Sequence, residues 1–130
     1  MVLQQLTAYL IHLLAGLGVV GVFVFIYLYV TPFREVKLIS DGGTAAALSL
    51  GGATLGFALT VASSILHNDS FFMFLFWAAC SAAAQLATYL VASRTMPSLN
   101  AALENNNVAM GGFMGVASLV VGIINAAALS

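Results

Sequence analysis

Four apolar stretches, each about as long as a membrane-spanning helix, constrain this chain more than any other feature of its sequence. They cover residues 6–30, 44–66, 71–93 and 108–129, and a helix needs about 20 apolar residues to cross a bilayer. Only 5% of the residues are charged, whereas about 25% are charged in a typical soluble domain. The stretches do not alternate in polarity as the strands of a membrane barrel would. The sequence therefore predicts an all-α membrane protein, a four-transmembrane-helix bundle that forms a single transmembrane domain over residues 1–130.

The loops between these stretches contain signals that begin or end helices. Pro32 follows the first stretch and should end it. Asp41 precedes the second stretch and Asn107 precedes the fourth, and a side-chain oxygen at such a position is typical of a helix N-cap. The His-Asn-Asp-Ser sequence at residues 67–70 predicts a tight turn that joins the second and third spans into a hairpin.

The basic residues predict the orientation of the chain in the membrane. All three, Arg34, Lys37 and Arg94, lie in the first and third loops. Lys and Arg near the ends of spans stay on the cytoplasmic side. We therefore expect both termini to be periplasmic.

The second and fourth stretches are alike, which predicts an internal duplication with halves 1–67 and 68–130. The two halves would be helical hairpins in the same orientation, a parallel repeat. The alternative is that two helices rich in small residues resemble each other through composition alone. The residues predicted to be equivalent are Gly56 and Gly122, Gly52 and Ser118, and Asp41 and Asn107.

Small residues spaced four apart on the second and fourth spans predict where helices pack. In lipid, helices associate where small side chains let their backbones approach closely. These two spans should lie inside the bundle, while the bulky first span faces lipid or another subunit. Four helices enclose little volume, so a transport path would form more readily between subunits than within one. We therefore expect a homo-oligomer. The predicted packing residues are Gly52, Gly56, Gly111, Gly115, Ser118 and Gly122.

Three polar side chains, His12, Gln85 and Asn125, lie within the predicted spans. His12 and Asn125 are at similar depths, and we expect a hydrogen bond between them; a neutral histidine near the interface is the alternative. Gln85 and Ser49 also lie at similar depths and form a second expected pair. Interhelical hydrogen bonds in membranes contribute about 0.6–2 kcal/mol. The sequence places no acidic or basic residue deep within a span, so a proton relay has no evident carrier.

No motif of an enzyme or of a cofactor site is present. The sequence lacks Gly-x-Ser-x-Gly, His-Glu-x-x-His and a phosphate-binding loop. Its single cysteine, Cys80, excludes metal sites built on several thiolates. We therefore predict no enzymatic activity, no cofactor and no metal. The net charge of −1 gives no reason to expect nucleic-acid binding.

Two segments carry a resemblance to a known family. Asp41-Gly42-Gly43 precedes an Ala-rich span that contains Gly52 and Gly56, and the Glu-Asn-Asn-Asn-Val-Ala sequence at residues 104–109 leads into the small residues of the fourth span. This pattern resembles the YjfL-type inner-membrane proteins, the domain-of-unknown-function 350 family. The resemblance implies a bacterial inner-membrane protein with four spans and no established activity. Genes of this family often lie beside those of envelope-associated membrane-stress proteins.

Together these features favour a non-enzymatic protein of the bacterial inner membrane. We expect it to self-associate in the lipid bilayer and to act with a cytoplasmic or membrane protein partner in envelope maintenance. The alternative is an oligomeric channel or small-solute transporter whose path lies between subunits. An intramembrane enzyme is disfavoured, because the spans contain no evident nucleophile–base pair.

Overall fold

A computed structural model of the chain describes residues 1–68 and 70–130, and every regular element within them is a helix. Four helices are long and apolar enough to cross a membrane, which confirms the predicted fold class. Asp69, in the predicted turn between the second and third spans, lies outside the described residues. The helices are α1 (Val2–Val30), α2 (Glu35–Ser40), α3 (Thr44–His67), α4 (Phe71–Thr95), α5 (Leu99–Glu104) and α6 (Val108–Ala128).

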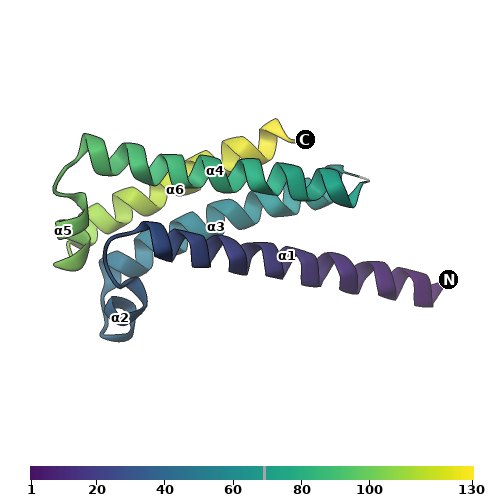
Figure 1. Cartoon of the computed structure of the whole chain (residues 1–130), viewed down its shortest axis with the longest axis horizontal. Helices are drawn as coiled ribbons and strands as arrows, with labels where there is room; N and C mark the ends of the chain where they lie inside the picture. The colour runs from purple at the N-terminus through teal and green to yellow at the C-terminus, as the bar shows by residue number, and fades with distance from the viewer. Residues whose placement is uncertain (69) are drawn as a thin grey trace.

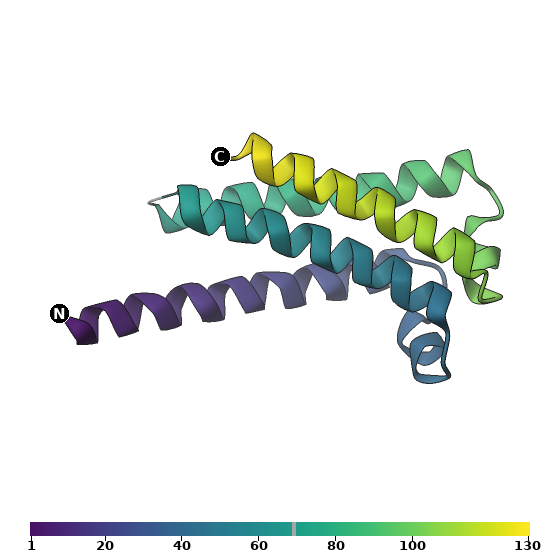
Figure 2. The same ribbon diagram turned by 180° about the vertical axis from the view of Figure 1, so that it is seen from behind.

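The four long helices alternate in direction along the bundle (Figure 1). Helices α1 and α4 run one way and α3 and α6 run the other, so the two chain termini lie at the same end. The short helices α2 and α5 both lie at the opposite end. Figure 2 shows from behind that α1 diverges from the other three long helices toward its N-terminus.

Helix α3 is the central helix, because it contacts α1, α4 and α6 and is more buried than any of them. Phe23 of α1 stacks on Phe57 of α3, with ring centroids 4.4 Å apart. The prediction that α6 lies inside the bundle is correct for only one of its faces. Its small residues pack on α3, while Val116, Val120 and Ile124 are exposed on the other side. A span rich in small residues, such as α6, can therefore pack through one face and still lie at the edge of the bundle.

The turns after α2 and α5 have the same backbone hydrogen bonds. The N–H of Gly43 donates to the carbonyl oxygen of Leu38 at 2.7 Å, and the N–H of Asn107 donates to that of Ala102 at 2.8 Å. Gly43 corresponds to Asn107 and Leu38 to Ala102, so the corresponding residues are 64 positions apart. The residues predicted to be equivalent are 66 positions apart. The predicted register is therefore wrong by two residues at these turns. The duplication itself stays a prediction.

Each of these turns contains one residue in the left-handed region of backbone conformation. Gly42 has a φ of 91° and Asn106 a φ of 58°. Glycine adopts this region without steric cost, and asparagine tolerates it better than most residues. The six-residue helices α2 and α5 therefore stop where the chain must reverse into α3 and α6.

The N-termini of α3 and α6 are capped in different ways. The Asn107 side chain accepts a hydrogen bond from the N–H of the third residue of α6 at 3.2 Å. Asp41 does not cap α3, so that prediction is wrong. It ends α2, and the N-cap of α3 is Gly43, which has no side chain. The oxygen that caps α3 comes instead from Asn106, whose Oδ1 accepts a hydrogen bond from the N–H of Ala45 at 2.9 Å.

Candidate functional site

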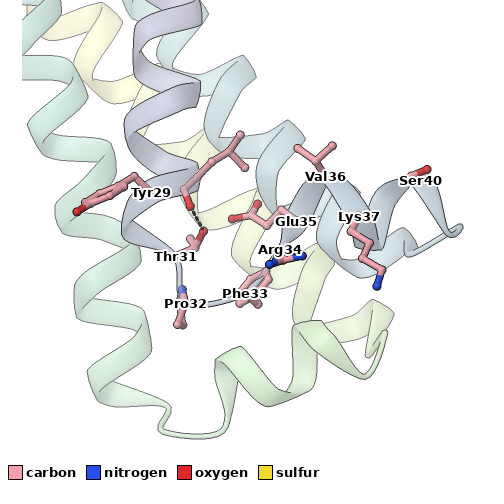
Figure 3. Close-up of a pocket in the computed structure, with 10 residues that line it drawn as sticks. Tyr29, Thr31, Pro32, Phe33, Arg34, Glu35, Val36, Lys37 and Ser40 are labelled. Carbon is pink, nitrogen blue, oxygen red and sulfur yellow. Dashed lines mark hydrogen bonds between the residues drawn. The ribbon is translucent and has the colours of Figure 1, made fainter.

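Glu35 is the first residue of α2, and its carboxyl group is buried at the junction of α1 and α2. Pro32 follows the end of α1, the chain turns, and α2 begins with Glu35 pointing back toward α1 (Figure 3). Only 1% of the Glu35 surface is exposed. The sequence places this residue in a loop, among charges on the membrane surface. The structure corrects this, because the turn at Pro32 directs the carboxyl group into the bundle.

No group in the described part of the chain neutralises this carboxyl. Neither Glu35 oxygen has a hydrogen-bond partner there. The nearby Thr31 hydroxyl donates to the carbonyl oxygen of Leu28 at 3.2 Å (Figure 3). Burial raises the pKa of Glu35 to about 7, and the neighbouring Thr31 hydroxyl opposes that shift only in part. A buried acid without a partner favours its protonated form.

Polar side chains from other segments lie near this carboxyl. Tyr27 of α1 is 1% exposed, and its hydroxyl has no partner among residues 1–68 and 70–130. Ser49 of α3 is buried beside that hydroxyl. Tyr89 of α4 meets Tyr27 edge to face at 5.6 Å, and it donates to Oδ1 of Asn100 at 2.6 Å. The residues of this Glu35 cluster are Tyr27, Thr31, Glu35, Ser49 and Tyr89.

A surface cleft of about 680 Å³ adjoins the cluster and is lined by Glu35, Arg34 and Lys37. In Figure 3 the Lys37 side chain extends away from the carboxyl group. Arg34 and Lys37 also line a second cleft of about 290 Å³, together with Asp41 and Glu104. The two basic residues therefore share the surface with other acidic groups and leave the buried one uncompensated.

The chemistry available to this cluster is that of one carboxyl group among hydroxyls. It contains no histidine or cysteine, and so it lacks the usual nucleophile–base pair. A carboxyl with a pKa near neutrality can exchange protons, and carboxylate and hydroxyl oxygens are suitable ligands for hard cations. The cluster is the strongest candidate site in the part of the chain that the structure describes.

Comparison with known proteins identifies the family of this chain. The family described as "Domain of Unknown Function (DUF350)" matches residues 1–129. The chain belongs to the DUF350 family. It is 33% identical over 129 residues to the UPF0719 inner membrane protein YjfL of Escherichia coli strain K12, a match that covers 99% of this chain and 98% of that relative; YjfL of E. coli O157:H7 gives the same values. No solved structure matches the chain.

Family membership and the four spans together make this DUF350 chain an inner membrane protein. The predicted family resemblance is therefore confirmed. The predicted topology residues Arg34, Lys37 and Arg94 are all exposed at the end of the bundle that carries α2 and α5. Which side of the membrane that end faces stays a prediction.

The six predicted packing residues of this DUF350 protein meet between α3 and α6. A Cβ atom on Gly52 would overlap the backbone of Gly115, and one on Gly122 would overlap that of Gly56. Gly56 and Gly122 are therefore contact partners across the two helices. The remaining contacts of this kind are those of Gly111 with Ala45, of Gly115 with Leu48 and of Gly56 with Ser118.

Gln85 connects α4 to α6, which is a different partner from the one predicted. Its Nε2 donates to the carbonyl oxygen of Ser118 at 3.0 Å, because the small residues at Gly56 and Ser118 bring the α6 backbone close. Ser49, the predicted partner, lies beside Tyr27 instead. The other polar atom of the Gln85 amide, Oε1, is buried without a hydrogen-bond partner within the described residues.

The predicted hydrogen bond between His12 and Asn125 is not formed. Asn125 donates to the hydroxyl oxygen of Ser81 on α4 at 3.2 Å. His12 lies on the exposed surface of α1, where its Nδ1 is 2.8 Å from the carbonyl oxygen of Ala8. The divergence of α1 from the bundle carries His12 away from α6 (Figure 1). Similar depth along two helices did not make their side chains neighbours.

Proposed function

We propose that this DUF350 protein is a non-enzymatic, self-associating bundle of the inner membrane that acts with partners in envelope maintenance. The observation that carries the proposal is a groove of about 610 Å³ between α1 and α4. It lies where α1 diverges from the bundle (Figures 1 and 2). The first fourteen residues of the chain, most of them in α1, are all exposed, so this part of α1 has no helix partner in one copy of the chain.

The lining of the groove suits another helix of the same chain. Its α4 side includes Ala78, Ala79, Ala82 and Ala83, and its α1 side includes Gly18. The space around Gly18 is open, because a Cβ atom at this position would have no neighbouring atom within 4 Å. Helices in lipid associate where small residues allow close backbone approach. We therefore assign the groove to an apolar helix of a second copy.

Cysteine cross-linking in native membranes tests this assignment. After Cys80→Ser removes the only native thiol, Ala79→Cys places a thiol at the groove, and Val120→Cys places one on the exposed face of α6. The two positions are about equally far from the same end of the bundle. A short bifunctional maleimide should join copies through residue 79 far more than through residue 120. Equal or no cross-linking at the two positions would refute the assignment.

A cytoplasmic partner would meet the end of the bundle that carries α2 and α5. Arg34 and Lys37 are exposed there, and exposed basic groups favour an acidic partner. A pull-down from native membranes with tagged chain should therefore lose a peripheral protein when both are changed to Gln. Glu104→Gln is the matched control, since it alters a charge at the same end without removing a basic group.

A channel or small-solute transporter remains the second candidate. The backbones of α3 and α6 touch along their glycines, so any path would lie between copies of the chain rather than between these helices. Solute or ion flux into liposomes containing purified protein separates the two functions. Flux above that of liposomes without the protein would favour transport.

A further inference from the structure

The Glu35 cluster contains an acid whose charge has no counterpart among the described residues. Tyr27 of α1, Thr31 at the end of α1 and Tyr89 of α4 lie near the acid, and Ser49 of α3 lies beside Tyr27. None of these groups is cationic at neutral pH. The basic neighbours Arg34 and Lys37 flank Glu35 in sequence but make no hydrogen bond to its oxygens. A buried ionised carboxylate is strongly disfavoured unless a cation accompanies it.

We propose that Glu35, together with the hydroxyl groups of Tyr27, Thr31 and Ser49, forms a binding site for a small monovalent cation. A proton and an alkali-metal ion share the required chemistry, because each neutralises the carboxylate and interacts with oxygen lone pairs. A divalent ion would leave one positive charge uncompensated. The site is independent of self-association through the groove between α1 and α4.

The positions of the oxygen atoms support this assignment. Both Glu35 oxygens and the Tyr27 hydroxyl are buried without partners in the part of the chain that is described. The Thr31 hydroxyl proton is directed to Leu28, so the lone pairs of that oxygen are free to face the carboxyl group. Alkali and alkaline-earth cations are bound by such sets of oxygen atoms.

Access and proton affinity are also suitable. Thr31 and Glu35 both line the cleft of about 680 Å³ at the surface, which gives an ion a short route from water. Burial raises the pKa of Glu35 to about 7, so protonation and deprotonation both occur near physiological pH. An alkali-metal ion that enters the site would have to displace this proton.

The sequence offers a clean measurement, because Glu35 and Glu104 are its only glutamates. Labelling the side-chain carboxyl carbon of glutamate with ¹³C gives two carboxyl resonances in the NMR spectrum of the purified protein in lipid nanodiscs. Glu104→Gln removes one, so the remaining resonance belongs to Glu35 even if Glu35→Gln does not fold. The Glu35 resonance is then titrated between pH 4 and 9, in turn with NaCl, KCl and choline chloride.

Two results would support the site and identify its occupant. A midpoint near pH 7 in all three salts identifies the proton. A midpoint that is lower in NaCl or KCl than in choline chloride identifies an alkali-metal ion that displaces the proton. Where an alkali-metal ion is the occupant, Thr31→Val should raise the midpoint in that salt towards its value in choline chloride, because it removes an oxygen ligand of the ion.

Two other results would overturn the proposal. A midpoint near the ordinary glutamate pKa of 4.5 in every salt would mean that Glu35 is ionised and solvated without an occupant. A midpoint that is unchanged in Thr31→Val and in Ser49→Ala would mean that the hydroxyl groups take no part in binding.

Discussion

Oδ1 of Asn106 accepts a hydrogen bond from the backbone N–H of Ala45 at 2.9 Å, although the two residues are 61 positions apart. Ala45 lies in the first turn of α3, where N–H groups have no acceptor within the helix. Asn106 itself holds the left-handed conformation that the turn before α6 requires. Asn106 therefore shapes the turn before α6 through its backbone and caps α3 through its side chain.

Replacing Asn106 should weaken both the turn before α6 and the cap of α3. Asn106→Ala should lower the free energy of unfolding by about 2 kcal/mol, because it removes a cap and places a less tolerant residue at positive φ. Asn106→Gly keeps the favourable backbone and should cost less. Unfolding by SDS from mixed micelles measures both changes. Asn105→Ala, at the exposed neighbouring position, is the control, and an equal loss in that variant would refute the role of the cap.

The glycines of α3 allow a second prediction with neighbouring positions. Gly52→Ala should destabilise the fold by about 1–3 kcal/mol, since the new methyl group would overlap the backbone of Gly115. Gly51 has no atom within 4 Å of a Cβ position. Gly51→Ala should therefore be neutral, or stabilising by up to about 1 kcal/mol through helix propensity. The same unfolding measurement compares them, and matching losses would contradict close α3–α6 packing.

Stability should fall as pH rises through neutrality. Burial raises the pKa of Glu35 from its ordinary 4.5 to about 7. The protonated acid therefore contributes its full stability below about pH 4.5. This contribution is lost progressively as pH rises from about 4.5 through 7, and the total change in the free energy of unfolding is about 3 kcal/mol at 1.36 kcal/mol per pKa unit.

Thermal unfolding between pH 5 and 8 in choline chloride measures this change without competing alkali-metal ions. Glu35→Gln carries no charge at any of these pH values, so it should be the more stable form at pH 8 and should lack the decline. An equally steep decline in Glu35→Gln would assign the pH dependence to other groups.

Hydropathy alone was sufficient to predict the four spans, because lipid requires a long apolar helix wherever the chain crosses it. The small residues of α3 and α6 also indicated which faces meet. Both inferences depend on the local sequence only. The helix bounds at Thr44, Phe71 and Val108 are the same in the sequence analysis and in the structure.

Features that depend on contacts between distant segments could not be predicted in this way. The cap of α3 comes from Asn106, in the other hairpin, and local sequence therefore favoured Asp41. Burial of Glu35 depends on the turn at Pro32 and on α3, neither of which is visible in the charge pattern of the loop.

Orientation in the membrane gives a further prediction. In a Cys80→Ser background, Ser130→Cys should react with a membrane-impermeant maleimide once the outer membrane alone is opened. Lys37→Cys, at the other end of the bundle, should react only after the inner membrane is also breached. These results follow from the basic residues at the α2–α5 end. The opposite pattern would place both termini in the cytoplasm.

The account depends most on self-association through the groove between α1 and α4. Counting photobleaching steps of fluorescently labelled chain in single nanodiscs extracted directly from native membranes tests it. Wild-type discs should contain more than one copy, and Ala82→Trp, which fills the groove, should leave mainly single copies that keep their helical circular dichroism. Single copies in wild-type discs, or unchanged assembly in Ala82→Trp, would contradict the account.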